Sequence, residues 1–331
     1  MRGTASLLPG FIGSVAVADN TPAAIALAAG DLRITILPLG ARLQSLHLEG
    51  IAQSLTLGSE NATDYETALA YAGPIIGPVA NRIGGASFRI GDQTYATDAN
   101  ERSSTTLHGG AGNTHARLWS IADRADDSVS LRLDLSDGLG GFPGNRVICA
   151  TWRISAPATL DLILTATSDA DTPMNLAHHP FWCLDPTGGD SLRVLADTYL
   201  PTDAANLPTG KISPVNATPF DLRLSRALSD PDLPSLDTNY CLSMERTLRR
   251  RVATLTGANG VRMEIETTEP GLQVFTGFDQ RAAGSNVPGR FVALEPQSWP
   301  DALNHANFPQ IILRPGETYR QETRYVISRI R

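Results

Sequence analysis

The sequence predicts an all-β protein built as one large antiparallel β-sandwich. Many short runs that alternate apolar and polar residues follow one another along the 331-residue chain, and a period of two is typical of strands with one buried face. Gly, Pro, Asn and Asp residues separate the runs, as expected of turns. Helical periodicity is nearly absent. Because no shift in composition divides the chain, we expect a single domain over residues 23–331.

The strands expected in the first half of the chain can be followed in order. A first hairpin turns at Gly30, a third strand follows it, and a second hairpin turns at Gly91-Asp92. Three longer alternating runs come next, and a glycine-rich turn at 137–144 separates the first two of them. The expected strands are 24–27, 32–37, 40–48, 88–90, 93–95, 129–135, 147–154 and 159–166.

The second half continues the pattern but holds more irregular sequence. Segments 64–69 and 222–228 are expected to be short helical turns, and 71–85 and 201–234 to be long irregular loops. Long loops in a compact β domain are more often functional than idle. The remaining expected strands are 192–200, 252–255, 261–267, 272–276, 291–294 and 318–327.

Charge and cysteine content exclude several classes of protein. The net charge of −7 argues against a nucleic-acid surface, which needs a basic stripe, and no apolar stretch is long enough to cross a bilayer. The cysteines, Cys149, Cys183 and Cys241, are odd in number and far apart, so they form neither a disulfide framework nor a metal-binding spacing. We therefore expect no metal and a reducing compartment, the cytoplasm.

The N-terminal residues 1–22 are expected to be an extension of the domain, either a tag or a degenerate signal peptide. Residues 7–18 are fairly apolar and end in a small-residue site. Pro9-Gly10 interrupts the apolar region, which disfavours a signal. If the segment does act as a signal, the protein is periplasmic instead.

Glu295 is the first candidate for chemistry. An apolar run of four residues, 291–294, ends on this carboxylate, and Pro296 follows at once. A residue before proline avoids the helical region, so we expect Glu295 to be extended and to lie at a strand end. The local pattern fits a surface glutamate equally well, and what favours a functional role is the presence of three histidines elsewhere in the chain.

These histidines are His108, His178 and His179. His108 lies between a leucine and two glycines, which let a ligand approach closely, although this pattern alone also fits a solvated turn. If the second pair is extended, its two side chains face opposite sides, so only one of them can enter a given cleft. His179 shares its side with Phe181, which predicts an aromatic floor beside it. Adjacent histidines on a strand do not chelate one ion together, so we do not expect zinc.

Polar groups that could hold a ligand come from two further places. Asn81 and Arg82 lie in the irregular segment 71–85, and an arginine can donate a fork of hydrogen bonds to vicinal hydroxyls. Asp237 follows a loop rich in Pro and Asp. Turn chemistry alone also accounts for the Asn and the Asp.

Taken together, these pieces resemble the aldose 1-epimerase (galactose mutarotase) family. No single piece is specific, but their number and order are. The resemblance covers roughly residues 34–325, and the matching pieces in order are Gly40-Ala41-Arg42-Leu43, Asn81-Arg82-Ile83, Leu107-His108-Gly109-Gly110, Asp137-Gly138, Gly141-Phe142-Pro143-Gly144, Asn175-Leu176 with His179, Pro208-Thr209-Gly210, Thr218-Pro219-Phe220-Asp221, Leu236-Asp237 with Asn239-Tyr240, Gly271 to Gly277, and the stretch around Glu295.

The resemblance implies a β-supersandwich and a cofactor-free interconversion of the α and β anomers of a free monosaccharide. By position, Glu295 is similar to the family's general base, His179 to its general acid and His108 to a second histidine at the sugar ring. Arg82, Asp237, Asn81 and Gln273 correspond to substrate ligands. His178 stands where the family commonly has Asn. For partners we expect a free monosaccharide, no nucleic acid, no membrane, and a monomer or homodimer.

The implied reaction specifies the protonation states expected of Glu295 and His179. Ring opening needs one group that takes the proton of the anomeric hydroxyl and another that protonates the ring oxygen. We therefore expect ionised Glu295 and protonated His179, with the acidic limb of a bell-shaped pH profile set by the carboxylate. We also expect a gap between the two groups that holds one sugar ring.

Two alternatives stay open on the sequence. A glycoside hydrolase could use Asp237 and Glu295 as its carboxylate pair, which requires a separation of about 5–9.5 Å. A carbohydrate-binding protein without catalysis could have the same fold. The histidines argue against both, since a hydrolase of that kind does not need them and pure binding needs no acid–base pair.

Overall fold

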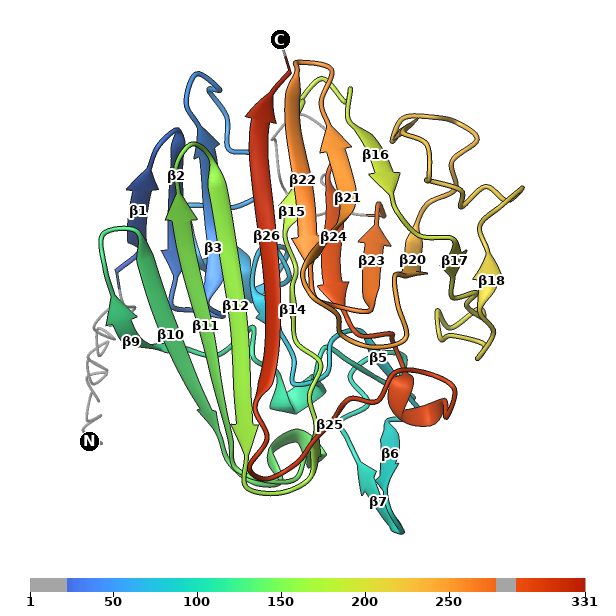
Figure 1. The fold of residues 1–331 in the computed structure, drawn as a ribbon. Coiled ribbons are helices and arrows are strands. Elements are labelled where there is room, and N and C mark those ends of the chain that lie inside the picture. Colours follow the sequence, from blue (N-terminus) through green and yellow to red (C-terminus); the bar gives the residue numbers. More distant parts are fainter. Residues whose placement is uncertain (1–22, 278–289, 331) are drawn as a thin grey trace, which may run out of the picture.

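The computed structural model describes residues 23–277 and 290–330, and its architecture is the predicted antiparallel β-sandwich (Figure 1). Residues 1–22, expected to be an extension, lie outside the described residues. In the described part, the helical elements are short 3-10 helices, namely Ala62–Glu66, Gly110–Gly112, Leu139–Gly141 and Ala302–Asn304. The first of these overlaps the helical turn expected at 64–69, but it begins two residues earlier and ends at Glu66.

The larger layer is a nine-stranded antiparallel sheet that faces the viewer in Figure 1. Its strands are β9 (Ser120–Arg124), β10 (Ser128–Leu135), β11 (Arg146–Ser155), β12 (Thr159–Ser168), β16 (Ser191–Val194), β19 (Arg226–Ala227), β21 (Arg250–Thr256), β22 (Val261–Thr267) and β26 (Tyr319–Arg329). They are ordered β19-β16-β21-β22-β26-β12-β11-β10-β9. The C-terminal strand β26 therefore joins the two halves of the chain.

The second layer is a six-stranded sheet behind the first. It is ordered β15-β24-β23-β20-β17-β18, and its strands are β15 (Phe181–Trp182), β24 (Val292–Gln297), β23 (Gly271–Phe275), β20 (Asp237–Cys241), β17 (Thr198–Tyr199) and β18 (Ser213–Pro214). Trp152 and Leu162 from the large sheet and Leu272 and Leu294 from this one are buried in the same apolar cluster. Burial of these apolar faces is the main force that holds the two layers together.

Smaller sheets complete the fold, and apolar residues of the three-stranded one are buried in the same cluster as those of the large sheet. One is three-stranded and the others are two-stranded ladders. They consist of β1 (Ile25–Ala29), β2 (Leu32–Leu37) and β3 (Arg42–Leu48), of β4 (Ile75–Ile76) with β14 (Ala177–His178), of β5 (Arg82–Gly84) with β8 (Thr105–Leu107), of β6 (Ser87–Ile90) with β7 (Gln93–Ala96), and of β13 (Thr172–Pro173) with β25 (Ile312–Leu313). Segment 71–85, expected to be irregular, thus contains β4 and β5.

Two other sequence expectations are wrong. The run 192–200 is not one strand, because β16 pairs in the large sheet and β17 in the small one, with the chain crossing between layers from Leu195 to Asp197. An alternating run does not reveal such a crossing, since its period is the same on both sides. Segment 222–228 is not helical and contains β19, which pairs with β16.

Strand β24 is buried along its whole length, and Glu295 lies inside it rather than at its end. The strand continues through Pro296 to Gln297. The carbonyl of Pro296 accepts a hydrogen bond from the Gln321 side chain, at 2.8 Å, instead of bonding to β23. The backbone nitrogen of a strand residue points to the same edge as its carbonyl, so the missing N–H of Pro296 costs no hydrogen bond to β23 and proline is tolerated there.

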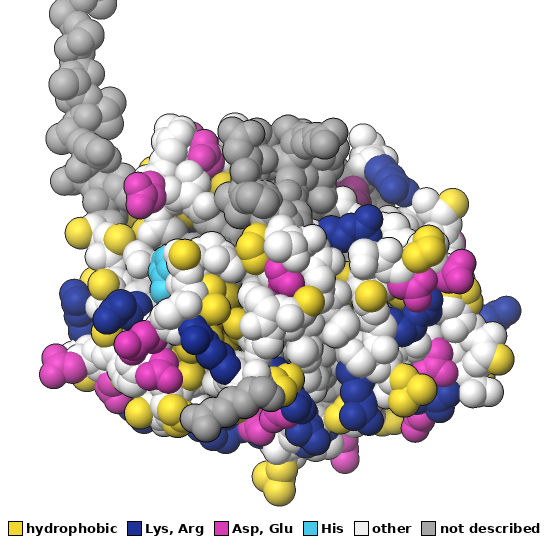
Figure 2. All heavy atoms as spheres, turned by 90° about the horizontal axis from the view of Figure 1, so that it is seen from above, with side chains coloured by type: hydrophobic (Ala, Val, Ile, Leu, Met, Phe, Trp, Pro, Cys, Tyr) yellow, Lys and Arg dark blue, Asp and Glu magenta, His cyan; other side chains and the backbone are white. Residues whose placement is uncertain are grey.

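The described surface in Figure 2 agrees with the expectation that the protein has no basic stripe. On the face shown in Figure 2, arginine and acidic side chains are interspersed, with no continuous basic stripe among the described residues. Within 23–277 and 290–330, no helix has the length and apolarity that a membrane span requires.

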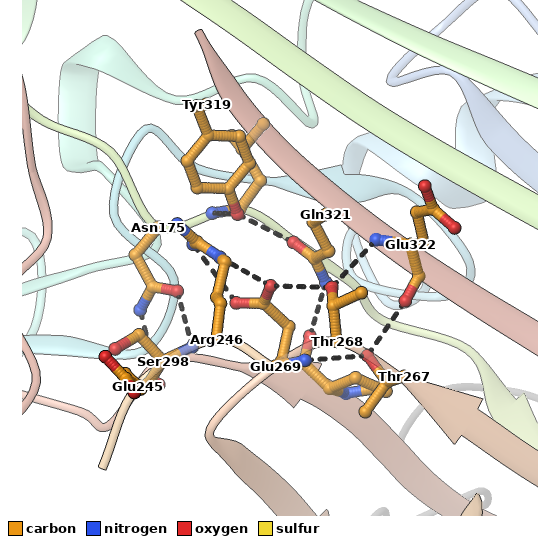
Figure 3. A network of polar contacts seen from close by, with 12 residues as sticks. Asn175, Glu245, Arg246, Thr267, Thr268, Glu269, Ser298, Tyr319, Gln321 and Glu322 are labelled. Atoms are coloured by element: carbon orange, nitrogen blue, oxygen red, sulfur yellow. Dashed lines mark hydrogen bonds and ion pairs between the residues drawn. The ribbon is translucent and has the colours of Figure 1, made fainter. Parts of the chain in front are cut away.

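A buried polar network ties the start of β26 to two neighbouring segments (Figure 3). The Tyr319 hydroxyl donates to Gln321 Oε1 at 2.7 Å and accepts from the Leu176 amide at 3.0 Å. Arg246 lies over the Tyr319 ring, 4.1 Å from its centroid, and forms an ion pair with Glu269 at 2.6 Å. Since Gln321 also holds Pro296, the network connects the segment before His179 with the strand of Glu295.

We expect Arg246→Leu to lower the free energy of unfolding by about 3 kcal/mol, because it leaves the fully buried Glu269 carboxylate without its cation. Chemical denaturation measures this. The matched control is Arg132→Leu, which breaks an exposed Arg–Asp fork and should cost less than about 1 kcal/mol. Equal losses in the two variants would contradict the role of burial.

Candidate active site

One face of the six-stranded sheet presents three of the predicted residues. The register pairs Gln273 of β23 with Glu295 of β24, and Asp237 of β20 with Phe275 of β23. Directly paired residues point to the same face of a sheet, so these side chains share one face. Residues that are well separated in the chain become neighbours in this way.

The opposing half comes from the ladder between β5 and β8. Arg82 pairs with Leu107, and Asn81 and His108 stand at the adjoining positions, both with a left-handed backbone (φ 61° and 50°). Their backbones are joined by a bond of 2.9 Å from the His108 amide to the Asn81 carbonyl. Gly109 is required next, since a Cβ there would lie 2.3 Å from the carbonyl oxygen of Gly77.

Between these halves lies a cavity of about 300 Å³, a size suited to a small ligand. The predicted residues that line it are Asn81, Arg82, His108, His179, Asp237 and Glu295. Gln273 does not line it but donates to Asp237 Oδ1 at 2.6 Å from behind.

Alternation around His179 is as predicted from the sequence. His179 lies beside the Phe181 ring, with centroids 5.1 Å apart, and both residues line the cavity. His178 points the other way into the core, where its Nδ1 lies 3.0 Å from the Tyr325 hydroxyl and its ring meets Trp152 edge-on. The residue in the family's usual Asn position is thus a packed core histidine.

His179 and Glu295 are in direct proximity, with 3.5 Å between His179 Nε2 and Glu295 Oε1. The expected gap that would hold a sugar ring is therefore wrong. At this separation no ring fits between the two functional groups.

Burial decides the charge state of this pair. It raises the pKa of Glu295 well above its usual value, a rise to which the nearby Asp237 adds and which Arg82 opposes. It lowers the pKa of His179 to about 4. Burial thus favours the uncharged form of both groups, the carboxyl of Glu295 and the imidazole of His179. This direction is opposite to the ionised carboxylate and protonated imidazole that were expected.

His108 is a neutral hydrogen-bond donor. Its Nδ1 accepts the Asn81 amide at 3.1 Å, so the neutral ring carries its proton on Nε2. Burial lowers the pKa of this histidine well below its usual value, and the neighbouring His179 lowers it further. The ring can thus donate to a ligand oxygen without gaining a charge.

Arg82 is the centre of charge compensation beside the cavity. Glu101 accepts from Arg82 Nε and Nη2 at 2.7 and 2.9 Å, and Asp237 accepts from Nη1 at 3.3 Å. Sequence reasoning missed Glu101, because nothing in its neighbourhood resembles a motif.

Aromatic walls were only partly foreseen. Tyr71 lines the cavity and lies between the rings of His108 and His115, at 5.0 and 4.9 Å from their centroids. Phe275 completes the wall opposite. The glycine beside Tyr71 indicated a loop, but no pattern indicated that its ring faces a cavity.

The donor set around the cavity does not suit a metal ion. Among the residues that the structure describes, no group of three or more His, Cys, Asp and Glu side chains could hold one. The three cysteines are free, and two of them are buried.

Comparisons with known proteins identify the family of the chain. A family model described as aldose 1-epimerase matches residues 23–326. Human galactose mutarotase is 32% identical over 344 residues, which cover 98% of this chain and 99% of that protein. The aldose 1-epimerase of Escherichia coli K12 is 29% identical over 315 residues, with 88% and 91% covered. A solved structure of a GalM/aldose epimerase homologue from C. elegans has a TM-score of 0.84 at 26% identity and covers 93% of this chain and 99% of that one.

We expect His179 to remain neutral from pH 5 to 8, because burial holds its pKa near 4. Following the imidazole signals of the substrate-free protein by NMR across this range measures it, with His179→Gln used to assign the signal. A midpoint between pH 6 and 7 would show that water reaches the pair and that the burial argument fails.

Proposed function

The chain belongs to the aldose 1-epimerase family and interconverts the α and β anomers of a free monosaccharide, and we propose that Glu295 and His179 transfer the protons of this reaction. The observation that carries the assignment is their approach to 3.5 Å on the wall of one cavity. Glu295 Oε2 is also buried without a hydrogen-bond partner in the described part of the chain. Such an atom is costly unless a ligand completes it.

In the proposed reaction, the Glu295 carboxylate takes the proton of the anomeric hydroxyl while the His179 imidazolium protonates the ring oxygen. The bond from the anomeric carbon to the ring oxygen breaks, its electron pair stays on the oxygen, and a carbonyl forms. The aldehyde end then rotates, and the same two transfers run backwards on the other face of the carbonyl. No atom is gained or lost, and no external oxidant or reductant is needed.

Burial favours the charge states that follow ring opening. After ring opening, Glu295 is protonated and His179 is neutral, which is the pair of charge states that burial stabilises. The ionised pair needed at the start is supported by Arg82, whose charge lowers the pKa of Glu295. The site can therefore lower the free energy of the open-chain intermediate relative to the closed sugar.

Other groups are proposed to hold the sugar. Asp237 offers carboxylate oxygens to hydroxyls, with Gln273 and Arg82 fixing its orientation. His108 donates from Nε2, and Asn81 orients His108 through its backbone. Tyr71 supplies an aromatic surface for the apolar face of a sugar.

The alternatives are not favoured. As a hydrolase, the protein would use Asp237 and Glu295 as its carboxylate pair, and the histidine that lies 3.5 Å from Glu295 would have no role in that reaction. Pure binding gives no reason to bury an acid–base pair without other partners, since burying ionisable groups costs free energy.

The pH dependence of kcat/KM is expected to be bell-shaped, because the active pair carries one proton. A second proton binds His179 as the pH falls toward its pKa of about 4, and the last proton leaves Glu295 as the pH rises through its elevated pKa. The acidic limb therefore belongs to the histidine and the alkaline limb to the carboxylate, the reverse of the assignment made from the sequence.

Initial rates on a freshly dissolved single anomer, followed by NMR at each pH, measure this profile. In Glu295→Gln any residual activity should lose the alkaline limb. An acidic limb that moves in Glu295→Gln and stays in His179→Gln would contradict the new assignment.

Glu295→Gln should lower kcat for anomer exchange by at least ~10²-fold, the low end for one acid–base group, with a smaller change in KM. His179→Ala and His178→Ala form a matched pair. The first should be nearly inactive. The second should keep its kcat per folded molecule but lose stability, since His178 is buried against Trp152. The opposite ranking of the two variants would overturn the choice of acid, and a wild-type protein inactive on all free aldoses would overturn the function.

A further inference from the structure

Glu101 does not line the cavity, but it contacts Arg82, the cationic side chain that does. From this geometry we infer that Glu101 is a positioning residue that locks Arg82 and balances its charge, so that the site takes neutral sugars and rejects anionic ones such as uronic acids. The inference rests on the proposed function, which supplies the sugar. It adds a residue and a rule of selectivity that the reaction itself does not require.

The contact between the two side chains is a full fork. Both carboxylate oxygens of Glu101 engage Arg82, at 2.7 Å from Nε and 2.9 Å from Nη2. Their side chains are 19% and 10% exposed, so water screens the pair little. A bidentate contact of this kind fixes the plane of a guanidinium as well as its position.

Glu101 is itself held firmly by the turn that leads into β8. Its amide and carbonyl both bond to Thr105, at 3.0 and 3.1 Å. The neighbouring Asn100 side chain accepts from the Leu107 amide at 2.7 Å and donates to the Leu107 carbonyl at 3.1 Å. Since Leu107 pairs with Arg82 in the β5–β8 ladder, the turn carrying Glu101 and the strand carrying Arg82 form one rigid unit.

The fork leaves Nη1 as the part of Arg82 that faces the ligand. Nη1 lies 3.3 Å from Asp237 Oδ2, so the guanidinium is shared between two carboxylates. A neutral hydroxyl can join this arrangement as both donor and acceptor. A ligand carboxylate can only accept, and it would compete with Asp237 for the same nitrogen.

Charge therefore discriminates between ligands. Among the described residues that line the cavity, Arg82 is the only arginine or lysine, and Asp237 and Glu101 already balance it. The nearby Arg42 is buried, with its Nη1 and Nη2 donating to the carbonyls of Leu69, Ala70 and Ala72. A uronate would lose its hydration and meet no unpaired cation, which is unfavourable.

The test removes the charge of Glu101 while keeping its shape. In Glu101→Gln, Arg82 keeps one acceptor in the fork and its contact with Asp237, but the surroundings of the guanidinium lose one negative charge. We expect KM for a neutral hexose to rise several-fold with little change in kcat. The ratio of kcat/KM for the matching uronate to that for the hexose should rise about tenfold or more, an increase that falls at high salt. D-Glucose with D-glucuronate and D-galactose with D-galacturonate are the probe pairs, followed by anomer-exchange NMR.

Two further variants separate charge from general damage. Glu101→Asp keeps the charge but shortens the side chain, so it should raise KM without admitting uronates. Asp161→Asn breaks an equivalent fork with Arg324, with the same distances of 2.7 and 2.9 Å, on the large sheet, and should change neither KM nor the ratio.

An unchanged uronate-to-hexose ratio in Glu101→Gln, or an equal change in Asp161→Asn, overturns the inference. Activity of the unmodified protein on a neutral hexose tests the proposed function separately. If that activity is absent, the same ratio is read from sugar affinities by NMR titration, and an unchanged affinity ratio in Glu101→Gln again overturns the inference.

Discussion

The burial of one carboxyl group, that of Glu295, is the constraint on which the site depends. The group lies on a strand covered on both faces, where an isolated negative charge would be unstable. Its protonated form is stabilised by that burial, and its ionised form relies on His179 and on the more distant Arg82. A carboxyl group that can exist in both forms at small cost is what repeated proton transfer within one turnover requires.

The same constraint explains how charge is arranged around the cavity. Three carboxyl groups surround a single guanidinium, and each has a different function in the proposed mechanism. Glu101 orients Arg82, Asp237 faces the sugar hydroxyls and Glu295 exchanges protons. Their roles differ because their exposure and their contacts differ, since the chemical groups are the same.

Rigidity comes from elements at some distance from the cavity. Tyr319 binds the backbone of Leu176 and Gln321 binds that of Pro296. The segments that carry His179 and Glu295 are thus both attached to strand β26, where Tyr319 and Gln321 lie (Figure 3). On the other wall, Asn81 and His108 keep left-handed backbones, a conformation that the surrounding ladder must stabilise.

The sequence by itself determined the fold class and most strands, because alternation and turn residues are local signals. The family motifs keep their order along the chain, and they made Glu295 and His179 the candidates for the acid–base pair. The sequence also indicated correctly that His179 and not His178 faces the cleft, since strand alternation is local too. Only the tertiary structure decided the register that places Gln273 beside Glu295, the crossing of 192–200 between layers, the 3.5 Å approach of Glu295 to His179 and the fork between Glu101 and Arg82. The tertiary structure also decided the directions of the pKa shifts. A pKa depends on burial and on neighbouring charges, and both arise only when distant segments pack together.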